Sequence, residues 1–276
     1  MQGSAWSSPE NTAVVNSYLR MLLCEWNGIP YNKSSERRAL SPMLSKRTDS
    51  SIEMKHRNIS AILLAYGIPP IYGYKPLPNI QISLEAAVLE GIGGIENFGD
   101  LAMQSMTSIG MNSDVPALEP AEIPSVTAPW KSARLRRQVI SNDLLAAEAQ
   151  SGAVHLMALK AVALHEKRTL AASERSDLAA AVEIRKNDYR TGTGLVISRS
   201  ISGSLRTILV KATNSLAEFP FMVSSDEVDL SLDASSGFRL YRVYGLRHRP
   251  GFYKLRGSLR AAAQLTASEY TVLPRS

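Results

Sequence analysis

The densest group of residues with ligand-binding chemistry is a basic run near the C-terminus. Between residues 239 and 268 the sequence holds seven Lys or Arg residues and no acid, with aromatic residues among them. Basic side chains neutralise phosphates, and aromatic rings can stack on unpaired bases. The run therefore predicts nucleic-acid binding. Alternatively, the aromatics fill a core while the arginines form a solvated strand face, which could itself still bind a phosphate backbone. The expected contacts are Arg239, Arg242, Arg247, Arg249, Lys254 and Arg256.

A second, smaller basic group lies in the first half of the chain. Lys55 and Arg57 flank His56, and Lys46 and Arg47 come shortly before them. Consecutive residues of a helix spread around its axis, so only part of this group can share one face. The group is either a phosphate-binding surface or a solvated helix face, and Lys55 and Arg57 are kept as candidate nucleic-acid contacts.

The sequence offers little for other kinds of chemistry. The single cysteine, Cys24, lies in an apolar helical pattern and cannot form an intramolecular disulfide. The four histidines are scattered without the spacing of metal ligands or of a nucleophile and its base. No apolar run approaches the roughly 18 residues that span a bilayer, and no signal peptide is recognisable. We expect a cytoplasmic protein that has no membrane partner and no cofactor.

The charge of the chain is distributed unevenly. Residues 131–276 carry twenty-two bases and thirteen acids, whereas residues 76–130 carry seven acids and no base. A localised basic excess attracts polyanions, of which nucleic acid is the commonest, although a soluble basic surface would give the same count.

The elements that must position these residues fall into two groups. Helical periodicity over 12–26, 50–66 and 84–89 predicts a mainly helical domain at 10–107. A Pro-containing acidic stretch at 108–130 reads as a linker. Helical sequence over 141–172 followed by short strands indicates an α+β domain at 131–276. The expected strands are 183–186, 195–199, 206–212, 219–224, 238–245 and 252–255.

Several short motifs in the second half occur in a recognisable order. They are 219–224 (FPFMVS), 226–228 (DEV), 240–244 (LYRVY) and 251–259 (GFYKLRGSL), preceded by Gly192-Thr193-Gly194 and by 208–214 (ILVKATN). From about residue 140 onward the chain resembles the C-terminal domain of the Protein NO VEIN family. The resemblance implies a restriction-endonuclease-like fold, in which a mixed or antiparallel sheet is flanked by helices.

A string in the first half points the same way. Residues 51–61 (SIEMKHRNISA), followed by 73–79 (GYKPLPN), resemble a segment that accompanies such domains in bacterial restriction-type and defence-type proteins. The resemblance implies a setting in restriction or phage defence, with nucleic acid and other defence-system proteins as partners.

The resemblance also implies catalytic residues that this sequence lacks. Nucleases of this class bind magnesium through a carboxylate on one strand and a second carboxylate two residues before a lysine on the next. Those positions correspond to Val196 and Leu209, while Lys211 is kept as a vestigial catalytic candidate. A helical glutamate of the family is also missing, since Leu159 and Lys160 fall near its place. Two apolar residues cannot bind a divalent ion, so the motif is degenerate.

Three functions remain open at this point. The preferred one is a non-catalytic nucleic-acid-binding protein, with DNA as the first candidate, on a pseudo-nuclease fold. The second is a magnesium-dependent nuclease with relocated carboxylate ligands, and the third is a protein-interaction module on a dead nuclease fold. Ligands for the second would come from Glu183, Asp188, Asp226 or Glu227.

Overall fold

The computed structural model describes residues 5–109, 114–124, 146–147, 151–185, 194–234 and 236–266. The chain forms two compact units, and both are discontinuous in sequence. Within the described ranges, the helical unit comprises the residues up to Ser108, residues 146–147 and Asn214–Pro220. The sheet unit comprises residues 109 and 114–124, the described residues from 151 to 213, and those from 221 onward.

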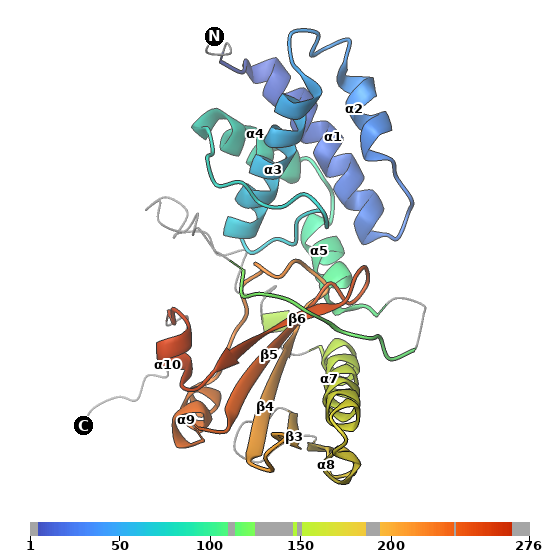
Figure 1. Cartoon of the computed structure of the whole chain (residues 1–276). Helices are drawn as coiled ribbons and strands as arrows, with labels where there is room; N and C mark the ends of the chain where they lie inside the picture. The colour runs from blue at the N-terminus through green and yellow to red at the C-terminus, as the bar shows by residue number, and fades with distance from the viewer. Residues whose placement is uncertain are drawn as a thin grey trace, which may run out of the picture. The chain divides into compact units, whose positions relative to one another are not determined.

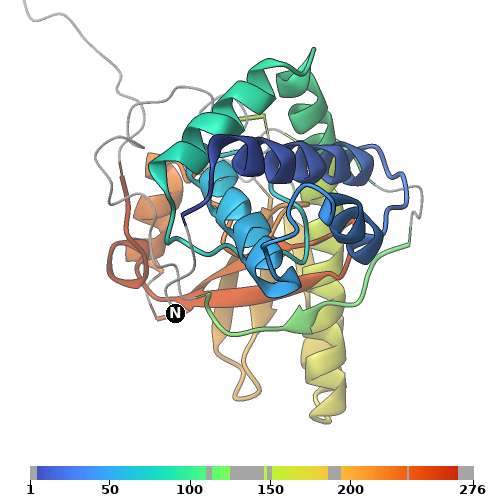
Figure 2. The same ribbon diagram turned by 90° about the horizontal axis from the view of Figure 1, so that it is seen from above.

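The helical unit is built around its first helix, which contacts the four others (Figure 1). In both views α1 and α4 lie side by side (Figure 2). None of the helices in the described ranges is long and apolar enough to cross a membrane. The helices are α1 (Ser8–Trp26), α2 (Lys33–Leu40), α3 (Asp49–Ala65), α4 (Ile82–Gly93) and α5 (Phe98–Thr107).

Capping residues fix where the two longest helices of this unit begin. Ser7 caps α1 and forms a reciprocal pair of hydrogen bonds with Glu10, while Pro9 occupies the first turn. Thr48 caps α3, and its hydroxyl accepts from the backbone N–H of Ser51. Such caps satisfy backbone donors that the first turn leaves free, so each helix starts at a defined residue.

Polar side chains inside the helical core are bonded to one another. The Tyr18 hydroxyl lies 2.8 Å from Ser60 Oγ and accepts from the backbone N–H of Ile71. His56 Nδ1 lies 3.2 Å from the Tyr74 hydroxyl, and the His56 side chain is fully buried. The hydroxyls and His56 Nδ1 thus have partners inside the core, whereas the buried Nε2 of His56 has none among the described residues.

The segment Asn214–Pro220 completes the helical unit from far along the chain. The side-chain amide of Asn214 donates to the carbonyls of Ser105, Met106 and Ser108 at the end of α5, at 3.1, 3.0 and 2.7 Å. Phe219 is 1% exposed and belongs to the helical core. The strand predicted at 219–224 is wrong, because the segment pairs with no strand: Phe219 is buried in the helical core, and Phe221 packs against Arg242 in the sheet unit.

The sheet unit contains six strands in the part of the chain that the structure describes. Their order is β1-β6-β5-β4-β3-β2, with β1 parallel to β6, β4 parallel to β5, and the other pairs antiparallel. A mixed sheet flanked by helices confirms the predicted α+β class. The strands are β1 (Glu119–Pro120), β2 (Glu183–Arg185), β3 (Leu195–Arg199), β4 (Leu205–Ala212), β5 (Phe238–Tyr244) and β6 (Gly251–Arg256).

Helices cover both faces of this sheet (Figures 1 and 2). The face against α7, here called the α7 face, holds a buried cluster that includes Val196, Ile208, Val210 and Val243 with Val162 of the helix. Alternate residues of each strand point to this face, and the register carries the alternation from strand to strand. The helices are α7 (Gly152–Ala172), α8 (Ser176–Ala180), α9 (Ser225–Asp233) and α10 (Leu259–Ala262).

Part of the expected linker is built into the sheet. The backbone N–H groups of Glu119 and Ala121 donate to the carbonyls of Pro250 and Phe252. These two hydrogen bonds join β1 to β6. Pro120 lies between these two donors at the edge of the sheet, where its missing N–H costs no ladder bond. Leu118 is buried in the core of this unit. The domain limits drawn from the sequence stay a prediction.

Candidate nucleic-acid interface

Three of the predicted contact residues share the α7 face at one end of the sheet. Arg239 of β5 pairs directly with Arg256 of β6, and Lys254 pairs with Tyr241 two residues along. Arg206 of β4 points to the same face, because Ile208, two residues later, pairs with Arg239. We call Arg206, Arg239, Lys254 and Arg256 the sheet-face basic cluster.

A buried carboxylate from α7 lies beneath this cluster. Glu166 is 2% exposed and accepts hydrogen bonds from the Tyr241 hydroxyl at 2.6 Å and from Ser198 Oγ at 2.8 Å. Nη1 of Arg206 lies 3.6 Å from the same carboxylate. Glu166 therefore ties together α7, β3, β4 and β5 at the base of the basic cluster.

The bases of the cluster are close enough to repel one another. Burial lowers the pKa of Arg239, and the charges of Arg206 and Arg256 lower it further. Burial also lowers the pKa of Lys254. Glu166 raises this pKa, and the charges of the three arginines lower it. Burial and the Glu166 charge raise the pKa of Tyr241. Four bases and one acid leave a net charge of +3 on this patch, and like charges directly opposite across strands are unfavourable.

The cluster is partly exposed to solvent. Arg256 is exposed, Arg239 and Lys254 are half-buried, and the side chain of Arg206 is 30% exposed. Nζ of Lys254 lies 4.6 Å from the centre of the Tyr241 ring and 5.1 Å from that of Phe252, so its ammonium group makes cation–π contacts on the α7 face. The cluster thus combines one exposed base with three that are partly buried.

Arg242 does not join this patch, although it is only one residue from Tyr241. Successive strand residues alternate between faces, and Arg242 points away from α7. It is 1% exposed, donates from Nη1 to the carbonyl of Ala212 at 2.8 Å and stacks over Phe221. Arg242 is therefore left out of the candidate interface, because a buried guanidinium cannot meet a polyanion without rearrangement.

Two further candidates lie on the connection between β5 and β6. Arg247 is half-buried, whereas Arg249 is exposed and pairs with Glu119 of β1 at 2.9 Å. This connection follows the end of β5 opposite to Arg239. Both residues are outside the sheet-face basic cluster.

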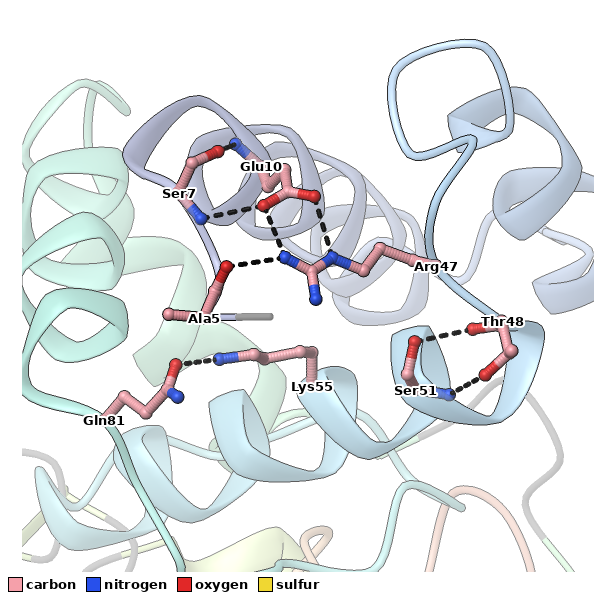
Figure 3. Close-up of polar contacts among 8 residues, drawn as sticks. All are labelled: Ala5, Ser7, Glu10, Arg47, Thr48, Ser51, Lys55 and Gln81. Carbon is pink, nitrogen blue, oxygen red and sulfur yellow. Dashed lines mark hydrogen bonds and ion pairs between the residues drawn. The ribbon is translucent and has the colours of Figure 1, made fainter. Parts of the chain in front are cut away.

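The N-terminal candidates lie in the helical unit, in a different environment (Figure 3). Lys55 is 5% exposed, donates to Oε1 of Gln81 at 2.6 Å and lies over the Trp6 ring. Arg47 makes two hydrogen bonds to the Glu10 carboxylate, at 2.7 and 2.8 Å, and a third to the carbonyl of Ala5. We call Glu10, Arg47, Lys55 and Gln81 the Arg47 cluster.

The charged groups of the Arg47 cluster are paired with one another and with neighbouring polar groups of the helical unit. The hydrogen bonds from Arg47 and from the Ser7 N–H lower the pKa of Glu10 to about 2. Burial, with the nearby charge of Arg47, lowers the pKa of Lys55 to about 8. Arg57 donates from Nε to the carbonyl of Lys75 at 3.0 Å. Lys55 is thus withdrawn from the surface, and Arg57 is partly engaged by the backbone.

The two positions at which the family resemblance implies metal-binding carboxylates do not lie in one site. Val196 pairs with Ile208 on the α7 face, whereas Leu209 pairs with Leu195 on the opposite face, and all four are buried. Side chains on opposite faces of a sheet cannot bind the same ion. The alignment of Val196 and Leu209 with two ligands of one metal therefore does not correspond to a shared site.

Lys211 is held in an internal ion pair. Its Nζ lies 2.7 Å from Oε1 of Glu227, and both side chains are largely buried. Glu227 also accepts from the backbone N–H of Ser224 and completes the N-terminal cap of α9. The pair links the end of β4 to α9, which is a structural role.

The relocated ligands considered from the sequence are also dispersed. Glu183 pairs with Arg185 on the edge strand β2, and Asp226 is exposed in the first turn of α9. Asp188 lies outside the described residues. In the ranges that the structure describes, no group of three or more His, Cys, Asp or Glu residues is placed to hold a metal ion.

Two residues of this site, Glu166 and Arg206, were not predicted from the sequence. Glu166 lies two turns after Leu159 on α7, where its charge interrupts an apolar helical pattern. Arg206 is the second residue of β4, at the start of the predicted strand. Glu166 lies on the apolar face of its helix, and charged residues are seldom buried without a partner. This position could have predicted a buried carboxylate with a polar or basic partner.

These residues fall almost entirely within a region with known relatives. Residues 165–255 match the family model Protein NO VEIN, C-terminal. The match covers about one third of the 276 residues, begins beside Glu166 and ends inside β6, one residue before Arg256. No curated protein and no solved structure matched the chain. The NO VEIN resemblance noted in the sequence is confirmed for this region.

Proposed function

We propose that the sheet unit binds nucleic acid through the sheet-face basic cluster and does not cleave it. The observation that carries the proposal is the net charge of +3 on this patch, formed by one exposed and three partly exposed bases set against the buried Glu166. A patch of this kind attracts polyanions, and guanidinium groups donate to phosphate oxygens in pairs.

The region of the NO VEIN match supports the same proposal. It contains Arg206, Arg239 and Lys254 as well as Glu166. We extend the proposal to a restriction-endonuclease-like origin of the sheet unit, to DNA as the first ligand to test, and to a cytoplasmic role in restriction or phage defence. The restriction-endonuclease-like origin and the defence setting rest on the family resemblance alone, and the cytoplasmic location rests on the sequence.

The absence of cleavage is proposed from the residues at the former catalytic positions. Val196 and Leu209 are apolar and lie on opposite faces, and the ammonium group of Lys211 is occupied by Glu227. A phosphodiester near these positions would meet neither a metal ligand nor an available lysine. Binding without hydrolysis is the activity that remains.

The test is a binding titration monitored by fluorescence anisotropy. Duplex and single-stranded DNA are titrated at two salt concentrations, with and without magnesium. We expect affinity to fall steeply with salt, because each phosphate contact contributes roughly −0.9 to the logarithmic slope on duplex DNA and roughly −0.7 on single strands. The double variant Arg239→Ala/Arg256→Ala should lose about two units of this slope on duplex.

A control variant removes one positive charge elsewhere in the sheet unit, as each single substitution of the pair does. Arg260 is exposed on α10, which packs against α9 and β6. Arg260→Ala should bind like the unmodified protein. Binding that ignores salt, or a double variant that binds as tightly as the control, would overturn the proposal. Magnesium-dependent cleavage of any of the substrates would overturn its non-catalytic part.

A further inference from the structure

The cations of the sheet-face basic cluster converge on one place rather than following a track. Arg206, Arg239 and Arg256 lie on three adjacent strands, and neighbouring strands are about 4.8 Å apart. The outer two are about 10 Å apart across the sheet, and Arg206 lies two residues, about 7 Å along β4, before the residue that pairs with Arg239. Each of the three acts on the charge of Lys254, and two of them act on the third, Arg239. Arg206 and Lys254 lie on either side of the Arg239–Arg256 pair along the strands, so an anion bound over that pair lies between them.

One guanidinium of the cluster is held in position before any ligand binds. Nη1 of Arg239 donates to the carbonyl of its own neighbour Phe238 at 2.6 Å and lies 3.4 Å from the carbonyl of Ser236. Arg206 is oriented from below by Glu166. Fixed donors lose less entropy when they bind an anion, so a compact ligand with several oxygens suits this arrangement.

The charge of the site favours a dianion. An internal phosphodiester carries one negative charge, whereas a terminal phosphate monoester carries about −1.5 to −2 near neutral pH and offers three strong acceptor oxygens. Against a net charge of +3, the monoester leaves less uncompensated charge and satisfies more donors. It also relieves the repulsion between the directly opposed Arg239 and Arg256 more fully.

We infer that the sheet-face basic cluster binds the terminal phosphate of a nucleic-acid strand in preference to internal phosphodiesters. The inference rests on the proposed function, since it specifies which phosphate of the nucleic acid the same cluster takes. It assigns the protein to the recognition of strand ends, such as those produced by cleavage.

The experiment compares single-stranded DNA of one sequence with a 5′-phosphate, a 3′-phosphate or hydroxyl groups at both ends. A strand one nucleotide longer, with hydroxyl ends, controls for the added charge. We expect a terminal phosphate at one of the two ends to tighten binding about tenfold, which is the effect of one strong charge-assisted contact. The longer control strand should bind like its parent.

Two variants and a change of pH give independent readouts. Arg256→Lys keeps the charge but removes the planar donor pair, so it should reduce the preference for the phosphorylated end more than the affinity for the hydroxyl-ended strand. Arg260→Ala should keep the full preference. Lowering the pH below about 6 protonates the monoester and should reduce the preference.

The outcomes separate the two proposals. Equal affinity for all strands, with all of them weakened by Arg239→Ala/Arg256→Ala, would overturn the terminal-phosphate inference and leave nucleic-acid binding intact. Absence of salt-dependent binding to every strand would overturn both. Competition by a nucleoside monophosphate at concentrations comparable to the strand would overturn the requirement for a strand and assign the site to a free phosphate monoester.

Discussion

The two basic groups of this protein differ in what surrounds them. In the Arg47 cluster, Arg47 is paired with Glu10, and Lys55 is nearly buried against Gln81 and Trp6. In the sheet-face basic cluster, one exposed and three partly exposed bases are set against one buried carboxylate, Glu166. The first arrangement stabilises the unit that contains it, whereas the second leaves positive charge for a ligand.

Residue type alone could not reveal this difference. The partner of Arg47 lies 37 residues away in the sequence, on α1, and Glu166 lies 40 residues before Arg206. Whether a base is compensated depends on which acid the fold brings to it. Pairing and burial therefore distinguish bases that stabilise the fold from bases that can bind a ligand. Three experiments test this distinction.

The largest effect is expected in the helical unit, on lowering the pH. Burial, together with Arg37 and Lys33, lowers the pKa of His56 to about 4, while Glu36 opposes the shift. The unfolded chain takes up this proton first, so stability is full above about pH 6.5 and falls as the pH approaches 4. The loss from His56 alone should approach about 3 kcal/mol, at 1.36 kcal/mol for each pKa unit.

Urea unfolding at several pH values measures this effect. Tryptophan fluorescence in a Trp130→Phe background reports on Trp6 and Trp26, which both lie in the helical unit. In the His56→Gln variant the fall between pH 6.5 and 4 should be smaller. A fall of the same size in both proteins would show that the buried histidine is not responsible.

The second experiment compares one arginine from each cluster. Arg47→Ala removes a two-point pair with Glu10 and the contact with Trp6, and should lower the free energy of unfolding by about 2 kcal/mol. Arg256→Ala removes an exposed base from a repulsive pair, and should change it by less than about 0.5 kcal/mol. Denaturation curves of the two variants measure both values. If Arg256→Ala proved as destabilising as Arg47→Ala, the distinction between the clusters would fail.

The smallest effect is expected at the carboxylate beneath the sheet-face basic cluster. Glu166→Gln keeps an oxygen for the Tyr241 hydroxyl but raises the net charge of the patch from +3 to +4. Affinity for DNA should rise by a few-fold, because the added attraction is that of one charge partly screened by solvent. Glu183→Gln, which neutralises an exposed acid on β2, is the matched control. Weaker binding by a folded Glu166→Gln variant would indicate that Glu166 contacts the ligand itself.

Much of the sheet could be predicted from the sequence. The strands expected at 195–199, 206–212 and 238–245 correspond to β3, β4 and β5 with ends that differ by at most one residue. Their β-branched and aromatic residues are buried between helices, so composition and structure agree. Helices α2 and α5 were missed because each is short and shows no long apolar period.

The site itself was only partly predictable. The sequence indicated Arg239, Lys254 and Arg256, but strand register decides that they share a face and that Arg242 does not. It suggested that aromatics and bases would occupy opposite faces, whereas Tyr241 and Lys254 lie together on the α7 face. Register depends on pairing between distant segments, and local patterns carry little information about it.

The interleaving of the two units has a consequence for the order of synthesis. The helical core includes Phe219, and the end of α5 is bonded to Asn214, more than a hundred residues later in the chain. The N-terminal helices can form as they leave the ribosome, but their core cannot close until residues 214–220 have emerged. By then β3 and β4 have also been made. The two units must therefore finish folding nearly together, and a protein truncated before residue 214 would leave the first one incomplete.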